Sequence, residues 1–379
     1  MSRLLLPARL LPLLLAAACS PPPPPGLASR AALVATAPTS DQSSTSVTLA
    51  GDIFASGWRV TVVADTAEAA ARARALAPVI QASLVEVEGR LSSWRADSEL
   101  SRFSHTNSTA PVDVSAATAD VVAACVDVSA RTDGAFDVTV GPLLDLWGFS
   151  PRTKGTVTSP PSAGAIDAAR ARIGWRRLHA VRSTGPGISA TLQKDDPALT
   201  VDVTAVTDGH AADVVATLLR QRGFERFLVD VAGEVVVAGP GLRGPWRVGI
   251  NTPSPDAADD DSVRQVVLVP AAGQTLALST SGTYREAWTD HVTRVSHILN
   301  PATGAPVTHA LVSCTIVGQD TVIADALSTA CVALGEAGTR AVLPRFAGYE
   351  ALFINADGGR FAVTTSADFP PDATPAPAP

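Results

Sequence analysis

The chain has 379 residues, of which 46% are hydrophobic and 17% are charged. This length and composition allow a substantial core, in one large or two closely joined domains, and exclude a disordered protein. The formal net charge of -7 provides no global basic field, so no nucleic acid is expected as a partner. The cysteines Cys19, Cys125, Cys314 and Cys331 lack CxxC or other metal-ligand spacing, so no zinc site is expected.

Residues 1–19 have the features of an export signal, with Arg3 near the start, a short apolar run, and small residues directly before Cys19. The run is too short for a membrane span. The small residues favour a lipoprotein signal peptide, in which Cys19 is lipidated and becomes the mature N-terminus; the alternative is an ordinary cleaved signal with an incidental cysteine. The first interpretation predicts an exported, membrane-anchored lipoprotein that faces the periplasm or the cell exterior.

Two further segments are not expected to pack. Residues 20–45 are rich in proline, serine and threonine, which is typical of a linker. Residues 369–379 are rich in proline and alanine, which is typical of a disordered tail. The folded domain is therefore expected within residues 46–368.

The expected elements are strands mixed with a few well-capped helices. Alternating apolar runs predict strands from Ser46 and from Trp58, and an Ala-rich helix follows from Thr66 with an interruption near Pro78. Short strands are expected between 178 and 250 and between 263 and 316, and a helix and strand pair ends the domain. The other helices are predicted from Ser115, from an N-cap at Ser159 to a stop at Gly174, from Ala205 to Arg222, and from Asp320 to Leu334. This order predicts an α+β or mixed α/β fold.

Asp325 and Thr329 lie four residues apart in the last of these helices, off its apolar stripe. Side chains at this spacing share one helix face, so a carboxylate and a hydroxyl can point at one cation. Oxygen ligands of this kind suit Mg²⁺. The alternative is a face of small residues packed under a loop, and the spacing alone favours neither.

His297 stands at the end of a predicted strand, directly before a turn formed by residues 300–304. A histidine there is held rigidly yet is reachable, as a general base must be. The alternative is a histidine hydrogen-bonded to the turn backbone. The segment STSGTYREAW around Ser281 offers hydroxyls and amides beside Tyr284, which suit either a nucleotide site or a polar hairpin.

Seven segments between about Phe54 and Ile354 carry a resemblance to a known family. They are LSSWRADSELSRFS from Leu91, GAFDVTVGPLLDLWGF from Gly134, VDVTAVTDGHAAD from Val201, LVDVAGEVVVAGPGLRGPWRVGINTP from Leu228, STSGTYR from Ser279, SHILNPATGAPV from Ser296 and ADALST from Ala324. In this order they resemble the ApbE family of FAD:protein FMN transferases. The resemblance implies a mixed α/β fold in a single unit, with the active site between two subregions.

The resemblance also implies roles for individual residues. The family's metal is held by a helix aspartate, a threonine one turn later and an alanine carbonyl, which match Asp325, Thr329 and Ala205. The catalytic histidine matches His297, which also lies at the flavin site. The flavin-binding or nucleotide-binding positions match Ser98, Glu99, Ser281, Gly282 and Tyr284.

Several positions depart from the family pattern. Asp208 stands at a cofactor-binding position where relatives carry a lysine. The family has two glycines directly before Glu234, and here the first of them is Ala232. The family's early methionine-glycine-threonine turn is replaced by residues 54–57. The aspartate and arginine of the histidine segment are Asn300 and Ala302.

The function implied is transfer of FMN from FAD to a threonine of a target protein, with Mg²⁺ as cofactor and release of AMP. The acceptor would be a threonine-bearing flavoprotein of a membrane or periplasmic redox system. Two alternatives stay open: an FAD pyrophosphatase that gives free FMN and AMP, and a degenerate lipoprotein that binds flavin without catalysis.

Overall fold

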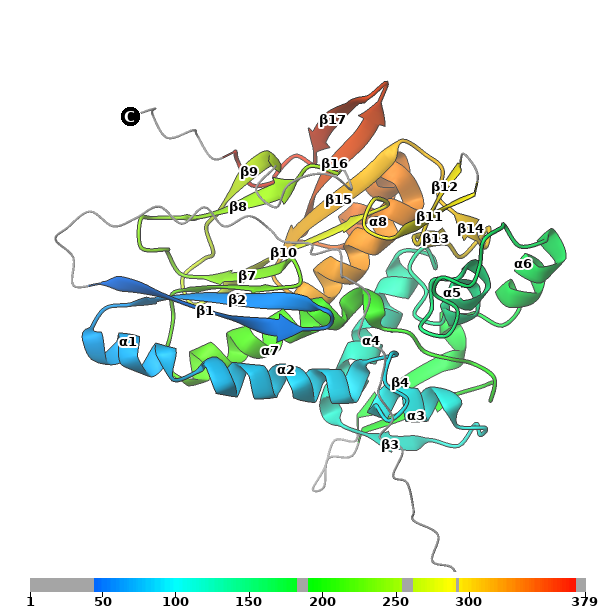
Figure 1. Cartoon of the computed structure of the whole chain (residues 1–379), viewed down its shortest axis with the longest axis horizontal. Helices are drawn as coiled ribbons and strands as arrows, with labels where there is room; N and C mark the ends of the chain where they lie inside the picture. The colour runs from blue at the N-terminus through cyan, green and yellow to red at the C-terminus, as the bar shows by residue number, and fades with distance from the viewer. Residues whose placement is uncertain (1–43, 183–189, 254–261, 291–292, 373–379) are drawn as a thin grey trace, which may run out of the picture.

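A computed structural model describes residues 44–182, 190–253, 262–290 and 293–372. The predicted signal with Cys19, the linker as far as residue 43 and the tail after residue 372 lie outside the described residues. The described part confirms the predicted mixed α/β class, since one large sheet is combined with several helices (Figure 1).

The central sheet has eight strands, and every neighbouring pair in it is antiparallel. The two strands expected from the first apolar runs pair as a hairpin at one edge. In spatial order the strands are β1 (Thr45–Ile53), β2 (Ser56–Ala64), β6 (Phe227–Val231), β7 (Glu234–Ala238), β10 (Thr275–Gly282), β15 (Leu311–Gly318), β16 (Glu350–Asp357) and β17 (Arg360–Thr365).

The helices are placed along and beside this sheet. They are α1 (Ala67–Arg74), α2 (Ala77–Leu91), α3 (Glu99–His105), α4 (Ala116–Arg131), α5 (Gly141–Trp147), α6 (Ala163–Arg170), α7 (Thr204–Gln221) and α8 (Thr321–Val342), with the short 3₁₀ turns η1 (Trp175–Arg177) and η2 (Leu343–Arg345). Smaller sheets are formed by β3 (Val112–Val114), β5 (Ala190–Lys194) and β4 (Leu178–Arg182), by β8 (Trp246–Asn251) and β9 (Ser262–Leu268), by β11 (Ala287–Asp290) and β12 (Thr293–Ser296), and by β13 (Leu299–Asn300) and β14 (Ala305–Pro306).

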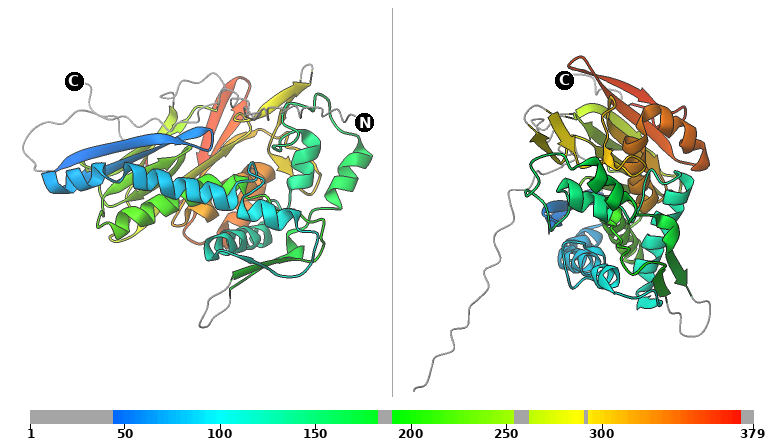
Figure 2. Two further views of the ribbon diagram at one scale, coloured as in Figure 1. Left: turned by 60° about the horizontal axis from the view of Figure 1, so that its bottom comes forward. Right: turned by 90° about the vertical axis from the view of Figure 1, so that its right-hand side faces the viewer.

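Both faces of the central sheet are covered, so its middle strands are buried throughout. On one face Val229 and Val236 join the main core, together with side chains of α2, α7 and α8. On the other face Leu228 and Val235 join a second core with the β8–β9 pair. Figures 1 and 2 show this layering, with α2 and α7 on one side of the sheet and β8 and β9 on the other. Because strand side chains alternate between faces, consecutive residues serve different cores.

The second core also takes in chain beyond the predicted end of the domain at residue 368. Phe369 is buried in it, and Val267 donates its backbone N–H to the carbonyl of Pro371 at 3.0 Å. The side chain of Phe369 packs in the same core as Val266 and Leu268 of β9. The packed chain therefore extends to residue 372.

Two helices begin where the sequence predicted, at Thr66 and Ser115. These residues are the N-caps of α1 and α4 and accept N–H groups of the first turns. The start predicted at Ser159 is wrong: α6 begins at Ala163, and Ser162 is its N-cap. Residues that precede a proline avoid helical backbone angles. The two prolines after Ser159 therefore prevent a helix from starting there, and the helix begins only after them.

The pair α7 and α8 forms the centre of the main core and carries most of the predicted metal residues. Gly209 donates its N–H to Oδ2 of Asp325 at 3.2 Å. One turn further along α7, Asp213 accepts the N–H and the hydroxyl of Thr321, at 3.2 and 2.7 Å. The two ties join residues four apart on each helix, so they fix the register of an antiparallel helix pair.

Helix α8 has the length and composition of a membrane span, but 67% of its apolar window is buried inside the protein. It therefore packs as a core helix. The regular helix is interrupted at Gly335, whose φ of 74° is left-handed, in agreement with the predicted end at Leu334. A shorter helical segment follows this break and leads to η2.

A second region lies at the end of the sheet, to the right in Figure 1. Here α5 and α6 share a small core with the β12 and β13 strands through Leu143, Trp147, Val295 and Leu299. His297 lies between these two strands. The predicted site residues therefore come both from the central helix pair and from this second region.

Gly209→Ala should reduce stability because a Cβ there would lie 2.9 Å from Oδ2 of Asp325 and 3.0 Å from the carbonyl of Thr321. Overpacking of this kind costs about 1 to 3 kcal/mol. The free energy of unfolding measured with urea checks it. Gly89→Ala on α2 is the matched control, since a Cβ there meets nothing within 4 Å, and it should stabilise by about 0.5 to 1 kcal/mol. Equal effects of the two variants would contradict the close helix contact.

Candidate active site

The predicted metal residues lie at one end of the α7–α8 contact. Ser281, near the end of β10, bonds through its hydroxyl to Thr329 at 3.0 Å and to Ser328 at 2.7 Å. Asp325 lies one helical turn before Thr329 and is 6% exposed, while Ala205 is in the first turn of α7. The structure therefore brings together Asp325, Thr329 and Ser281, which are separated by up to 48 residues in the sequence.

Three buried carboxyl groups influence one another at this place. Burial raises the pKa of Asp208 and of Glu234 to about 7, and the positive charge of Arg285 opposes the rise in both. Burial raises the pKa of Asp325 well above its usual value, and the negative charges of Glu234 and Asp208 add to the effect. One guanidinium thus faces three acids, and the group carries an excess of potential negative charge.

The excess of potential negative charge is the observation that tests whether the residues fit Mg²⁺. Asp325 accepts one backbone N–H, and no ion pair joins it to an arginine or lysine among the described residues. Within the same part of the chain, no three His, Cys, Asp or Glu side chains are close enough to hold a metal on their own. A carboxylate, the Thr329 hydroxyl and a backbone carbonyl would form a hard, all-oxygen donor set. The donor set and the charge fit Mg²⁺.

Two polar atoms in the group have no hydrogen-bond partner within the described residues. They are Oε2 of Glu234 and Nε of Arg285, both buried. Arg285 also lines a small cavity of about 20 Å³ together with Gly233, Thr280 and Tyr284. Buried polar atoms of this kind are usually satisfied by protein, water or a ligand, and the cavity beside Arg285 has room for about one water molecule.

His297 is oriented by the backbone of Glu286. The carbonyl of Glu286 accepts the backbone N–H of His297 at 3.1 Å and lies 2.9 Å from its Nδ1. A carbonyl can only accept, so Nδ1 carries the proton and Nε2 of the neutral ring has its lone pair available. Burial lowers the pKa of His297, which the bond to Glu286 opposes. The ring is thus a neutral, oriented base, with Phe149 edge-on at 6.3 Å.

The segment from Ser281 to Glu286 links the two halves of the site. Ser281 contacts the α8 hydroxyls, and Glu286 holds His297. Five residues of extended chain span at most about 18 Å, so the backbone at Ser281, beside the α8 hydroxyls, lies within that distance of the backbone that orients His297. Gly282 allows this turn to be tight, because the Tyr284 ring lies where a Cβ would be.

Ser98 and Glu99 use their side chains in local structure. Ser98 caps α3 by accepting the N–H of Ser101 at 3.0 Å. Glu99 accepts the N–H and the hydroxyl of Ser115, both at 2.7 Å, and a hydroxyl from Thr118. Although burial raises the pKa of Glu99, these hydrogen bonds lower it below its usual value. Their predicted contact with the nucleotide stays a prediction.

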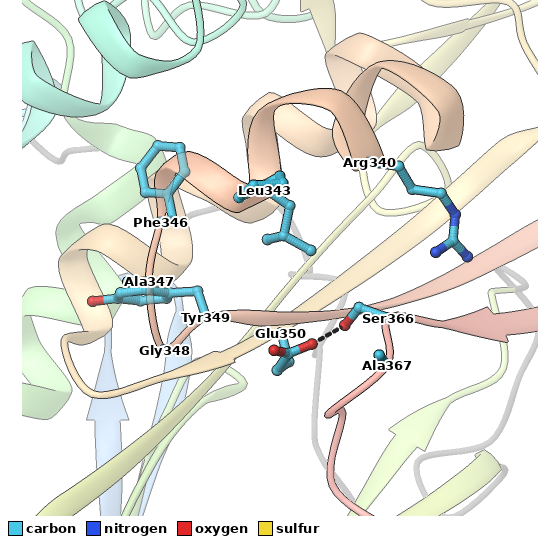
Figure 3. Close-up of a pocket in the computed structure, with 10 residues that line it drawn as sticks. Arg340, Leu343, Phe346, Ala347, Gly348, Tyr349, Glu350, Ser366 and Ala367 are labelled. Atoms are coloured by element: carbon cyan, nitrogen blue, oxygen red, sulfur yellow. Dashed lines mark hydrogen bonds between the residues drawn. The ribbon is translucent and has the colours of Figure 1, made fainter.

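A cavity of about 330 Å³ lies elsewhere (Figure 3). It is an open depression beside η2 and β16, and none of the predicted site residues lines it. Its polar groups are engaged: Glu350 accepts the hydroxyl of Ser366, and Arg340 is bonded to Glu336 and to the carbonyl of Thr365. Size alone therefore does not mark the site.

The sequence prediction did not include Glu234, Arg285 and Glu286 among the site residues. Arg285 directly follows Tyr284 in the segment that was singled out, so a charged residue in a Ser-, Thr- and Gly-rich stretch was an available signal. Glu234 begins a strand that is otherwise apolar and fully buried. A lone acid in such a strand is a second signal, since buried charges are rare unless they are used.

The histidine assignment can be checked by NMR. The ¹⁵N spectrum of His297 should show the proton on Nδ1 at pH 7, and the ring should titrate below 6.5 because burial disfavours its charged form. The same residue in urea-unfolded protein should titrate near its ordinary value, which is about 6.5. A proton on Nε2, or a midpoint above that of the unfolded protein, would show that His297 is not the available base.

Comparison with known proteins tests the family resemblance. The model of the ApbE family matches residues 41–353. The FAD:protein FMN transferase of Klebsiella pneumoniae (strain 342) is 38% identical over 336 residues, which are 88% of this chain and 91% of that protein. The one of Salmonella typhimurium is 38% identical over 322 residues, 85% of this chain and 87% of that protein.

Solved structures of similar proteins agree with this family match. The flavin transferase ApbE from Vibrio cholerae superposes with a TM-score of 0.70, at 33% identity, over 86% of this chain and 98% of that one. The apo form of the flavinyl transferase ApbE from Pseudomonas stutzeri superposes with a TM-score of 0.70, at 32% identity, over 85% and 95%. The fold predicted from the resemblance is thus confirmed, and the chain belongs to the ApbE family.

Proposed function

We propose that this chain transfers FMN from FAD to a threonine of an acceptor protein, in an Mg²⁺-dependent reaction that releases AMP. The relatives named above are FAD:protein FMN transferases. The observation in this chain that carries the proposal is the segment from Ser281 to Glu286, which joins an oxygen-rich, negatively charged cluster to a neutral histidine. A phosphoryl transfer needs both, because it combines a charged diphosphate with a hydroxyl nucleophile.

The proton of the nucleophile is assigned to His297. The threonine hydroxyl attacks the phosphorus of the FMN half of FAD, the bond from that phosphorus to the oxygen of AMP breaks, and AMP leaves. Nε2 of His297 takes the hydroxyl proton, while the carbonyl of Glu286 holds Nδ1–H and keeps the ring oriented.

Asp325, Thr329 and the carbonyl of Ala205 would hold Mg²⁺. The ion would neutralise charge on the diphosphate during transfer. Arg285 adds a fixed positive charge next to the acids, and the exclusion of water by the surrounding core strengthens these interactions. The acceptor is expected to be a flavoprotein of a membrane or periplasmic redox system.

The proposal is tested with the purified protein, FAD, Mg²⁺ and a threonine-bearing acceptor peptide. The expected result is an FMN mass addition to the peptide and equimolar AMP. Asp325→Asn should abolish the Mg²⁺-dependent rate, since the amide is neutral. His297→Ala should lower kcat by about two to four decades, the usual range for loss of a general base, with little change in FAD affinity.

Each alternative has its own outcome in this assay. Free FMN and AMP without peptide modification would show a pyrophosphatase. Bound FAD that is never turned over would show a flavin-binding protein without catalysis. Thermal unfolding of both variants provides the control for folding, and unchanged activity of Asp325→Asn with unchanged Mg²⁺ dependence would contradict the metal assignment.

Asp208 predicts a dependence on pH. With a pKa of about 7, it is mostly protonated at pH 6 and mostly ionised at pH 8. In the absence of Mg²⁺, FAD should therefore bind more weakly at pH 8, and Asp208→Asn should recover about 1 to 2 kcal/mol there and little at pH 6. Calorimetric titration at both values measures this. If Asp208→Asn instead weakens Mg²⁺ binding, the carboxylate is an additional ligand.

We also propose that Cys19 carries a lipid that anchors the exported protein to a membrane, with residues 20–45 as a tether. What supports this is the run of small residues before Cys19 after a short apolar segment. Cys19→Ala should move the protein from the membrane fraction to the soluble fraction. A variant that stays with the membranes as the wild type does would rule the anchor out.

A further inference from the structure

Lys154 lies at the rim of the site, in the loop that follows α5. Its Nζ lies 2.7 Å from Oε1 of Glu286, the residue whose carbonyl orients His297. The same amine is 5.3 Å from the centre of the Trp94 ring. A loop outside the central sheet therefore places a cation next to the residue whose backbone orients the histidine.

The rim continues from Lys154 to the start of α7. Trp94 is 52% exposed, an unusual position for a large apolar ring. Its neighbour Ser93 bonds to the hydroxyl of Thr204 at 2.9 Å, and Thr204 is the first residue of α7, next to Ala205. The exposed Trp94 ring is thus linked to the amine of Lys154 and, through Ser93, to the first residue of α7.

The ion pair with Glu286 contributes too little to stability to explain why a lysine stands at position 154. Both side chains are 44% exposed, and such exposed pairs contribute little to folding. An ammonium group has three N–H donors, and one is used for Glu286. The other donors are available to a ligand at the rim.

The charge of the interior indicates which kind of ligand the remaining donors of Lys154 would suit. Behind the rim, Asp208, Glu234 and Asp325 outnumber Arg285. A diphosphate that enters this site meets negative charge, so a cation at the entrance would favour its binding on electrostatic grounds.

We propose that Lys154 is a substrate-binding residue that contacts the diphosphate of the flavin dinucleotide at the rim of the site, beside Trp94. The inference rests on the proposed function, and it assigns a phosphate contact to a loop residue outside the segments that define the metal and the base. When the dinucleotide binds, the amine turns from Glu286 towards the phosphate oxygens, or bridges both.

The experiment measures binding of three probes to the full-length protein with Mg²⁺ present. FAD carries ring and diphosphate, ADP carries the diphosphate without the flavin, and riboflavin carries the ring alone. Lys154→Ala should weaken FAD and ADP about tenfold, leave riboflavin unchanged, and reduce the salt dependence of FAD binding. Lys154→Arg should stay within about threefold of wild type for all three.

Arg152→Ala is the matched control. It removes a cation from the same loop, two residues away, that pairs with Asp145 instead, and it should leave all three affinities unchanged. An equal loss from Arg152→Ala would show a general effect of loop charge and overturn the proposal.

Three further outcomes bear on the role of Lys154 or on the proposed function. Equal weakening of FAD and riboflavin would mean that Lys154 acts through the Trp94 ring. Unchanged FAD affinity with a lower kcat and a shifted pH profile would mean that it only positions His297 through Glu286. Wild-type protein that binds FAD but never modifies an acceptor would refute the proposed function while leaving the binding comparison readable.

Discussion

The close contact between α7 and α8 is the constraint on which the site depends. At Gly209 the two helices approach so closely that a backbone N–H reaches the carboxylate of Asp325. The second tie, from Asp213 to Thr321, fixes the register. Since protein interiors are packed as tightly as organic crystals, this contact sets the place of every oxygen on that face of α8, including Thr329. A glycine in the middle of a helix normally weakens it, but here it permits the approach.

The same contact concentrates acids in a core that offers one guanidinium to balance them. Burying a charge without a partner is costly, and the raised pKa values of Asp208, Glu234 and Asp325 express that cost as a preference for the neutral form. A divalent cation and the ionised acids would stabilise one another. The proposed affinity for a cation would therefore be a property of the packed core as much as of the ligand set.

The parts that the sequence predicted are those with local causes. Thr66 and Ser115 cap their helices because the chemistry of a cap lies within four residues, and Asp325 and Thr329 share a helix face by spacing alone. Glu234 and Arg285 could not be joined to them, because only tertiary packing brings β7 and the segment after β10 to α8. Two turns that depart from the family pattern have positive φ values, 53° at Ala232 and 54° at Phe54, so their backbone conformation is imposed by the hairpins and cannot be inferred from these residue types.

Burial acts in opposite directions on the two kinds of titratable group in the site. It lowers the pKa of His297, so the ring stays neutral at a lower pH than an exposed histidine would. It raises the pKa of Asp208 and Glu234 to about 7, so these acids give up their protons only near neutrality. A reaction that needs both a neutral histidine and ionised acids around a cation is therefore limited at low pH by the carboxyl groups. Arg285 lowers the pKa of both kinds of group, so one guanidinium between them widens the range in which the two required forms coexist.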